Sequence, residues 1–232
     1  MLREERENRN SLFQTTHSLT RTLQRPPYTV DDTRYKRFDE RNTMFSRVVW
    51  DKTCIGYGRF TEERMLERLA QRKPGYSRLD YALHAASWTV DETYKGAFSW
   101  EKLAGVGVDK REAPGERTGS QLASLKKYKV KDSARMSMQT KKVAKFFGAS
   151  LVGICKPDQR WIYSHTRTGS PVTIPEDFKY AVVMALEMDP VLIGTSPAVT
   201  AAAAAGKGYS QMAFTIACVG EFIRGLGYKA IQ

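Results

Sequence analysis

The order of helical patterns and apolar runs after residue 131 constrains the fold of this 232-residue chain most strongly. The stretch "KDSARMSMQTKKVAKFFG" predicts a helix that Gly148 ends. Two apolar runs of strand length follow, "SLVGICK" and "KYAVVMALEMD", with the edge-like run "RWIYS" between them. The second long run is continuously apolar, which is typical of a strand covered on both faces. The pattern predicts strands flanked by helices, an α+β arrangement over 131–232.

The closing stretch "GKGYSQMAFTIACVGEFIRGLGYKAIQ", Gly206–Gln232, predicts the last helix. A short alanine helix should precede it, with Ser196 as its cap and Pro197 at its first position. We expect this alanine helix to end at Gly206, so that Tyr209 stands at the start of the last helix. The predicted core-facing residues of the last helix are Met212, Ala213, Ile216, Val219, Gly220 and Ile223.

Before residue 131 the patterns predict a polar, extended arm over 1–30 and a helical and loop region over 31–130. Thr61 caps a strongly predicted helix, "TEERMLERLAQRKPG". A second helix is predicted at Tyr76–Tyr94, with Leu79, Leu83, Ala86 and Val90 on one apolar stripe. The residues at 95–120 are rich in glycine and charge, which indicates a long loop of the kind that often binds something.

The net charge of +12 is compatible with nucleic acid, an anionic membrane surface or an acidic cofactor as a partner. The basic residues spread along the whole chain, however, which favours a solvated basic surface, and we expect no nucleic acid partner. No apolar run approaches the roughly 20 residues of a membrane span. Neither an apolar signal segment nor a twin-arginine pair is present.

The three cysteines and three histidines show no metal-binding spacing. Cys155 lies in the apolar run "LVGIC", and Cys218 falls on the predicted buried side of the last helix. Both are therefore predicted to be core thiols. A metal site made from this chain alone is not expected.

Five stretches in order resemble the reductive dehalogenase family, in its corrinoid-binding N-terminal portion. They are "YKRFDERNTMFSRVVWD", "GYSRLDYALHAASWTV", "FFGASLVGI", "KYAVVMALEMD" and "GYSQMAFTIACVGEFIRGLGYKAI". The resemblance covers about residues 28–232. It implies a nitroreductase-like corrinoid-binding domain with a mixed sheet flanked by helices, preceded by an irregular, helical N-terminal region. It also implies a corrinoid of the cobalamin type and two [4Fe–4S] clusters.

In such enzymes a carbon–halogen bond is replaced by a carbon–hydrogen bond. The resemblance assigns Tyr209 as the proton donor, and corrinoid cobalt as the electron donor. A phenol has an ordinary pKa of about 10 and can donate a proton when a neighbouring cation stabilises the phenolate. The family's cation and its cluster cysteines do not occur in this sequence, so we expect a chain truncated before the cluster motifs and inactive alone. The structural alternative is that Tyr209 only packs at a helix start.

Three aromatic residues match the family's halocarbon pocket: Trp88 and Tyr94, with Trp50 as a further candidate. Core packing is an equal alternative for these rings. The loop 195–208 is the candidate for corrinoid contact, because its small side chains and glycines permit close approach of the backbone. Its candidate contact residues are Thr195, Ser196, Thr200, Gly206, Lys207 and Gly208. Lys207 either meets a phosphate of the cofactor or stays solvated.

Two other interpretations stay open. One is an epoxyqueuosine reductase-like enzyme that modifies tRNA with the same cofactors, for which the basic charge is suitable. The other is a non-catalytic corrinoid-binding module.

The resemblance also implies an organohalide substrate and a small membrane-anchor protein, and it leaves a homodimer open. It further implies a peripheral location on the outer, periplasmic face of the cytoplasmic membrane, reached through an export signal that this sequence does not show.

Overall fold

A computed structural model describes residues 28–59, 61–94 and 127–231, apart from the side chains of 92–94. Most of the predicted arm at 1–30 and the predicted loop at 95–120 lie outside these residues. The described elements are η1 (Glu40–Asn42), α2 (Met44–Trp50), α3 (Glu62–Ala70), α4 (Arg78–Tyr94), α7 (Ser133–Phe146), β1 (Leu151–Cys155), η2 (Gln159–Trp161), β2 (Ala181–Ala185), α8 (Pro190–Ile193) and α9 (Val199–Gly225). The content is helix-rich with a small antiparallel sheet, which is compatible with the α+β class.

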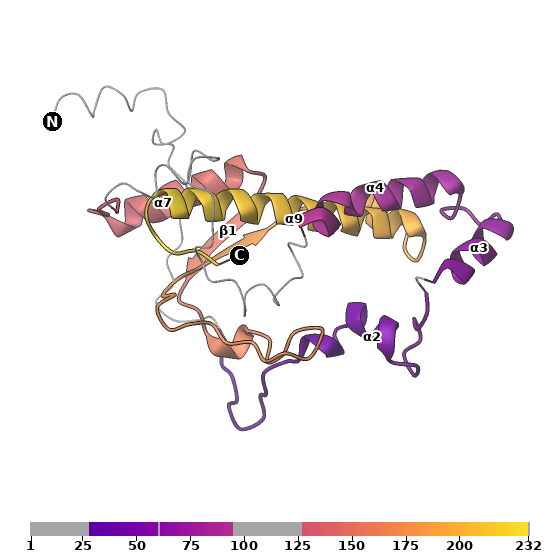
Figure 1. Cartoon of the computed structure of the whole chain (residues 1–232), viewed down its shortest axis with the longest axis horizontal. Coiled ribbons are helices and arrows are strands. Elements are labelled where there is room, and N and C mark those ends of the chain that lie inside the picture. The colour runs from indigo at the N-terminus through magenta and orange to yellow at the C-terminus, as the bar shows by residue number, and fades with distance from the viewer. Residues whose placement is uncertain (1–27, 60, 95–126, 232) are drawn as a thin grey trace.

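Helix α9 is the central helix of the structure, because α4, α7 and α8 all contact it (Figure 1). It packs along α4 at its N-terminal half and meets α7 towards its C-terminal half. The α9 face towards α4 is built from small residues, and Ala203, Gly206 and Ser210 on it are buried. Ser210 Oγ donates to Ser87 O at 2.6 Å and accepts from Asp91 N at 3.2 Å. The two helices are therefore joined by close backbone approach and by a buried polar contact.

The prediction of two successive helices around Gly206 is wrong, because α9 runs unbroken through Gly206 and Gly208. Its N-cap is Ala198, without a side-chain cap bond, so the predicted cap at Ser196 is wrong too. A glycine inside a helix costs roughly 1 kcal/mol relative to alanine. The close approach of α4 at Gly206 gives that glycine a packing role that the sequence pattern does not reveal. Tyr209 consequently lies inside a long helix, not at its start.

The other predicted helices are confirmed. The side chain of Thr61 accepts from Arg64 N at the start of α3, and Asp132 caps α7 through Ala134 N and Arg135 N. Gly148, with φ of 105°, follows the end of α7. In α4, however, the predicted apolar stripe is exposed, with Leu79 at 82%.

The face of α4 that packs instead carries polar and aromatic side chains, namely Tyr81, His84, Ser87, Trp88 and Asp91. Because Gly206 on α9 has no side chain, Ser87 and the Trp88 indole of α4 pack closely against it. The residues that α9 presents at this contact, and not the hydropathy of α4, thus decide which face of α4 is buried.

Strands β1 and β2 pair antiparallel, with Leu151 opposite Ala185 and Gly153 opposite Val183. The strand predictions at these runs are confirmed in position, but the predicted burial is wrong. Leu151 is 70% exposed, and the described residues do not cover both faces of β2. Cys155 is likewise exposed, and Cys218 is only partly buried.

The predicted edge strand at "RWIYS" is also wrong, because this segment begins with the 3-10 helix η2. The carboxylate of Asp158 accepts from Arg160 N at 2.9 Å and from the Arg160 guanidinium. These local bonds turn the chain and compete with a sheet ladder.

A small hydrophobic core lies where α7, the sheet and the end of α9 meet. Its buried members are Val143, Ala144, Ala149 and Val219, and the partly buried Phe147, Val152, Met184, Phe222 and Ile223 pack on them. The fully buried Thr215 donates to Phe147 O at 2.8 Å, which satisfies the end of α7.

A second layer lies beneath these helices and joins residues 35–51 to residues 158–172 (Figure 1). Arg37 holds the layer together by donating to the carbonyls of Ile162, Tyr163 and Val172. Glu40 N donates to His165 O, and Ser164 N donates to Phe38 O. Among the described residues, no helix is both long and apolar enough to cross a membrane.

Candidate active site around Tyr209

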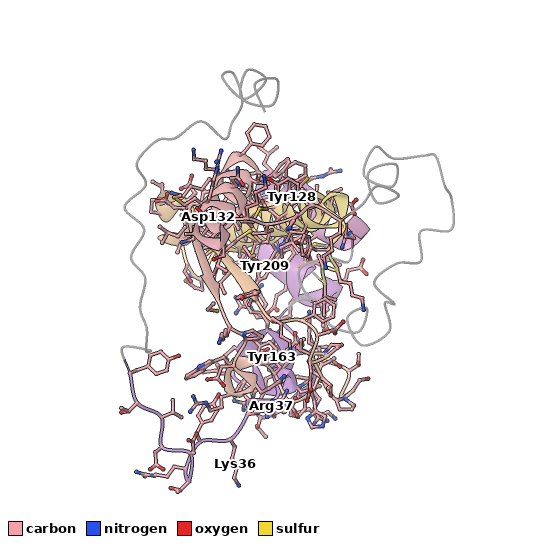
Figure 2. The ribbon with its side chains drawn as sticks, turned by 90° about the vertical axis from the view of Figure 1, so that its left-hand side faces the viewer. Lys36, Arg37, Tyr128, Asp132, Tyr163 and Tyr209 are labelled. Atoms are coloured by element: carbon pink, nitrogen blue, oxygen red, sulfur yellow. The ribbon has the colours of Figure 1, made fainter. Side chains whose placement is uncertain are left out.

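Tyr209 lies between the two layers, on the side of α9 that faces the lower one (Figure 2). Its ring stacks on Trp88 of α4, with centroids 5.3 Å apart and planes at 20°. Phe45 of α2 meets the same ring edge-on at 5.9 Å. Offset stacking and edge contacts are the favoured aromatic geometries. Three helices distant in sequence therefore hold one phenol in an aromatic setting.

The pKa of the Tyr209 phenol is raised, first by burial and then by the negative potential of Tyr163, Asp91 and Glu40. Arg167 acts in the opposite direction and lowers it. Glu40 is 2% exposed and also raises the pKa of Tyr163, after burial of that ring. Burial and these charges therefore disfavour the phenolate and make Tyr209 a weaker acid, whereas Arg167 is the cation that favours loss of its proton.

Gly206 positions the stack. A Cβ at this residue would lie 2.4 Å from Ser87 Oγ and 2.5 Å from Trp88 Cδ1. The Trp88 indole therefore occupies the space that a side chain at 206 would take. Its Nε1 is buried and has no hydrogen-bond partner among the described residues.

The structure brings Tyr209 and Trp88 together, as predicted residues of one site, but it separates Trp50 from them. Trp50 is 54% exposed and donates through Nε1 to Arg41 O at 3.0 Å. Phe45, five residues earlier on the same helix, takes the place that was predicted for Trp50. Tyr94 ends α4, and its side chain lies outside the described set.

Sequence reasoning missed Phe45, Tyr163 and the buried carboxylates Glu40 and Asp91. The one available signal for Phe45 was its place in the family-like stretch "YKRFDERNTMFSRVVWD". Burial of the carboxylates comes from contacts distant in sequence, which no local pattern encodes.

The candidate corrinoid contacts fall into three sets. Gly206 and Gly208 are buried by the protein's own side chains, Gly206 by α4 and Gly208 by Met188, whose Cγ lies 3.3 Å from the position of an added Cβ. Thr195 and Thr200 contact each other through their hydroxyls at 2.6 Å. Ser196 and Lys207 are exposed.

Because neighbouring side chains already cover Gly206 and Gly208, these two glycines do not fit a contact with a corrinoid ring in this structure. Among residues 28–59, 61–94 and 127–231, no group of three or more His, Cys, Asp or Glu side chains is arranged to hold a metal ion.

Comparison with known proteins gives the site a context. A tetrachloroethene reductive dehalogenase of Dehalobacter restrictus is 27% identical to this chain in an alignment that covers 74% of the chain and 42% of that protein. A protein of the same name from Desulfitobacterium hafniense matches at 27%, and one from Sulfurospirillum multivorans at 24% over 71% of the chain. The chain thus spans about two fifths of the length of these relatives. No family model matches it.

Proposed function

Because the chain is related to the reductive dehalogenases, we propose that it forms the corrinoid-binding portion of such an enzyme and supplies its proton donor, Tyr209. The proposed substrate is an organohalide of the chlorinated alkene class, which is apolar and suits an aromatic pocket. The domain division at residues 30 and 130 and the nitroreductase-like fold belong to the same proposal.

The observation that carries the proposal is the partly buried phenol of Tyr209, which lies against Trp88 and Phe45 and close enough to the Arg167 cation for that charge to lower its pKa. Replacement of carbon–halogen by carbon–hydrogen takes up two electrons and one proton and releases a halide ion. The Tyr209 O–H supplies the proton to the carbon that loses the halogen. The Trp88 and Phe45 rings fix the position of the phenol from which the proton leaves.

The electrons are assigned, by resemblance alone, to a corrinoid fed by two [4Fe–4S] clusters. Gly206 and Gly208 do not offer the contact predicted for them, so we derive no step through the corrinoid. Thr195, Ser196 and Lys207 are the predicted contacts that are exposed in this structure. Attachment to the outer face of the cytoplasmic membrane through a small anchor protein, and a homodimer, are further parts of the proposal.

The test is Tyr209→Phe in the whole protein isolated with its cofactors, with chloride release from tetrachloroethene as the assay. General acid catalysis contributes roughly 10²- to 10⁴-fold, so we expect kcat to fall by at least about 100-fold. Tyr180→Phe is the matched control, because Tyr180 is exposed and is not part of the stack of Phe45, Trp88 and Tyr209. Near-normal turnover by Tyr209→Phe, with corrinoid still bound, would contradict the role of the phenol.

A further inference from the structure

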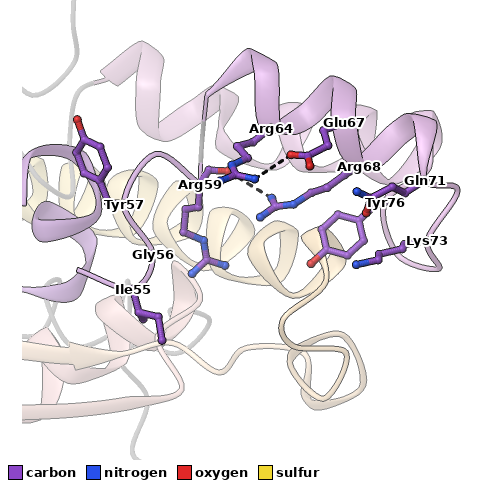
Figure 3. A pocket seen from close by; sticks show the side chains of 10 residues that line it. All are labelled: Ile55, Gly56, Tyr57, Arg59, Arg64, Glu67, Arg68, Gln71, Lys73 and Tyr76. Carbon is purple, nitrogen blue, oxygen red and sulfur yellow. Dashed lines mark hydrogen bonds and ion pairs between the residues drawn. The ribbon is translucent and has the colours of Figure 1, made fainter. Parts of the chain in front are cut away.

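A basic cleft of about 380 Å³ opens beside α3, away from the Tyr209 stack (Figure 3). Loop 55–59, helix α3 and the turn into α4 form its walls. Four cationic side chains line it, Arg59, Arg64, Arg68 and Lys73, against the single carboxylate of Glu67. Its size falls within the range of roughly 300–1,000 Å³ that is usual for small-molecule sites.

The carboxylate does not neutralise the cleft. Glu67 accepts from Arg64 Nη1 at 2.9 Å, so its charge is matched within the helix. Beyond this pair the lining holds three more cationic side chains, Arg59 from the loop, Arg68 from α3 and Lys73 from the turn, which Figure 3 shows on different walls of the cleft. An anion placed there would meet charge-assisted donors from two sides.

The cleft is held in shape before any ligand binds. Arg68 donates to Arg59 O at 3.3 Å, and its guanidinium lies 5.2 Å from the centre of the Tyr76 ring. Tyr76 in turn donates its hydroxyl to Pro197 O at 2.7 Å, and Val199 N donates to Gly75 O. The turn between α3 and α4 is thereby tied to the start of α9, which lowers the ordering cost of binding.

A second cavity of about 170 Å³ continues the cleft towards α4 and shares Arg59, Arg68 and Tyr76 with it. Met65, Val199 and Ala202 give this end apolar walls, and Thr61, Glu62 and His84 add polar ones. Tyr81 also lines it, and its hydroxyl is buried without a hydrogen-bond partner among the described residues. A buried hydroxyl left in this way costs free energy that a bound polar group would recover.

We propose that the two cavities together bind a small phosphate ester of about mononucleotide size. Its phosphate lies among Arg59, Arg68 and Lys73. Its organic part packs on Tyr76 and extends to the Tyr81 hydroxyl. The assignment does not depend on the role of Tyr209, because none of these residues touches the Trp88–Tyr209 stack.

An acidic protein segment is the competing partner for a basic surface. The concave shape and the second cavity, which has apolar walls, the Glu62 carboxylate and the unmatched Tyr81 hydroxyl, favour a small molecule, because a flat acidic partner would leave that end unused and would meet Glu62. The phosphate diester of a corrinoid's nucleotide has the same ligand chemistry as a free mononucleotide. The two sources are separated by competition.

The experiment is calorimetric titration of the 232-residue chain with inorganic phosphate, AMP and adenosine at low ionic strength. We expect AMP to bind more tightly than phosphate, and adenosine to bind weakly or not at all. Arg68→Gln and Lys73→Gln should each weaken AMP binding by about tenfold or more, because each removes a charge-assisted contact. Tyr81→Phe should weaken AMP binding but leave phosphate binding unchanged.

Arg78→Gln is the matched control, since Arg78 is an exposed cation near the cleft that does not line it. Equal losses in Arg78→Gln and Lys73→Gln would show nonspecific attraction and overturn the proposal. The absence of binding at millimolar AMP would overturn it too, as would displacement of phosphate by an acidic peptide without AMP binding. Lys73 is exposed, so its variant tests the site even if Arg68→Gln fails to fold. Displacement of AMP by hydroxocobalamin would identify a corrinoid as the source of the phosphate ester, and AMP binding that persists would identify a free nucleotide.

Discussion

Gly206→Ala is the sharpest test of how the Tyr209 site is assembled. The added methyl group would lie 2.4 Å from Ser87 Oγ and 2.5 Å from Trp88 Nε1, closer than Cβ atoms are found in proteins. Helix α4 must move away or Trp88 must leave its position. Such overpacking costs about 1–3 kcal/mol, and loss of the aromatic stack adds about 0.5–1.5 kcal/mol. Alanine returns about 1 kcal/mol of helix propensity, so we expect a net loss of about 0.5–3.5 kcal/mol.

Gly208→Ala is the matched control on the same helix. Its nearest neighbour is the flexible side chain of Met188, with Cγ at 3.3 Å, so the methyl group can be accommodated. We expect this variant to unfold at an equal or higher urea concentration than the parent chain. Urea unfolding followed by far-ultraviolet circular dichroism measures both, and near-ultraviolet circular dichroism reports the Trp88–Tyr209 stack. If Gly206→Ala is as stable as Gly208→Ala and keeps the near-ultraviolet signal, the close approach of α4 and α9 at this point is wrong.

Three further predictions follow from the contacts. Ser210→Ala removes both bonds to α4 and should lower the free energy of unfolding by about 1–2 kcal/mol in urea, whereas a loss within error would show that the polar contact is incidental. Thr61→Ala should cost about 1 kcal/mol and Thr61→Ser much less, as judged by thermal unfolding, because the hydroxyl caps α3; equal losses would point to packing of the methyl group. The pKa of Tyr209 is raised in the folded chain, so its contribution to stability is full below pH about 10 and is lost as the pH rises through the folded pKa. Absorbance titration at 295 nm, with Tyr209→Phe as the blank, should place this phenol above the ordinary value, and Arg167→Gln should raise it further; an unshifted phenol would refute burial of the site.

Part of the fold is readable from local pattern. The cap of α3 at Thr61, the stop of α7 before Gly148 and the positions of β1 and β2 follow from capping, glycine conformation and apolar runs. These signals act within a few residues, so a sequence carries them directly. The assignment of Tyr209 as a site residue rests on resemblance and stays a prediction; the structure shows that its ring stacks on Trp88.

Other features depend on neighbours distant in sequence. Hydropathy selected the wrong face of α4, because small residues on α9 favour Ser87 and Trp88 at the contact over Leu79. The local pattern predicts a helix end at Gly206, whereas its lack of a side chain makes room for the Trp88 indole of α4. Phe45 contacts Tyr209 where Trp50 was the predicted neighbour, and the cause is similar. The packing of the lower layer, in which Trp50 donates to Arg41 O, decides which face of α2 meets Tyr209.

The sequence by itself determined where most helices and strands lie, a basic surface, and a tyrosine flanked by glycines that resembles a known proton donor. Tertiary structure alone decided that the two predicted C-terminal helices are one, that Phe45 and Trp88 contact the phenol, and that three further cationic side chains line one cleft with Tyr76. The physical reason is one of range. Capping and periodicity act along the chain, whereas burial, ring contacts and the electrostatic potential at Tyr209 arise from residues brought together only when α2, α4 and α9 pack.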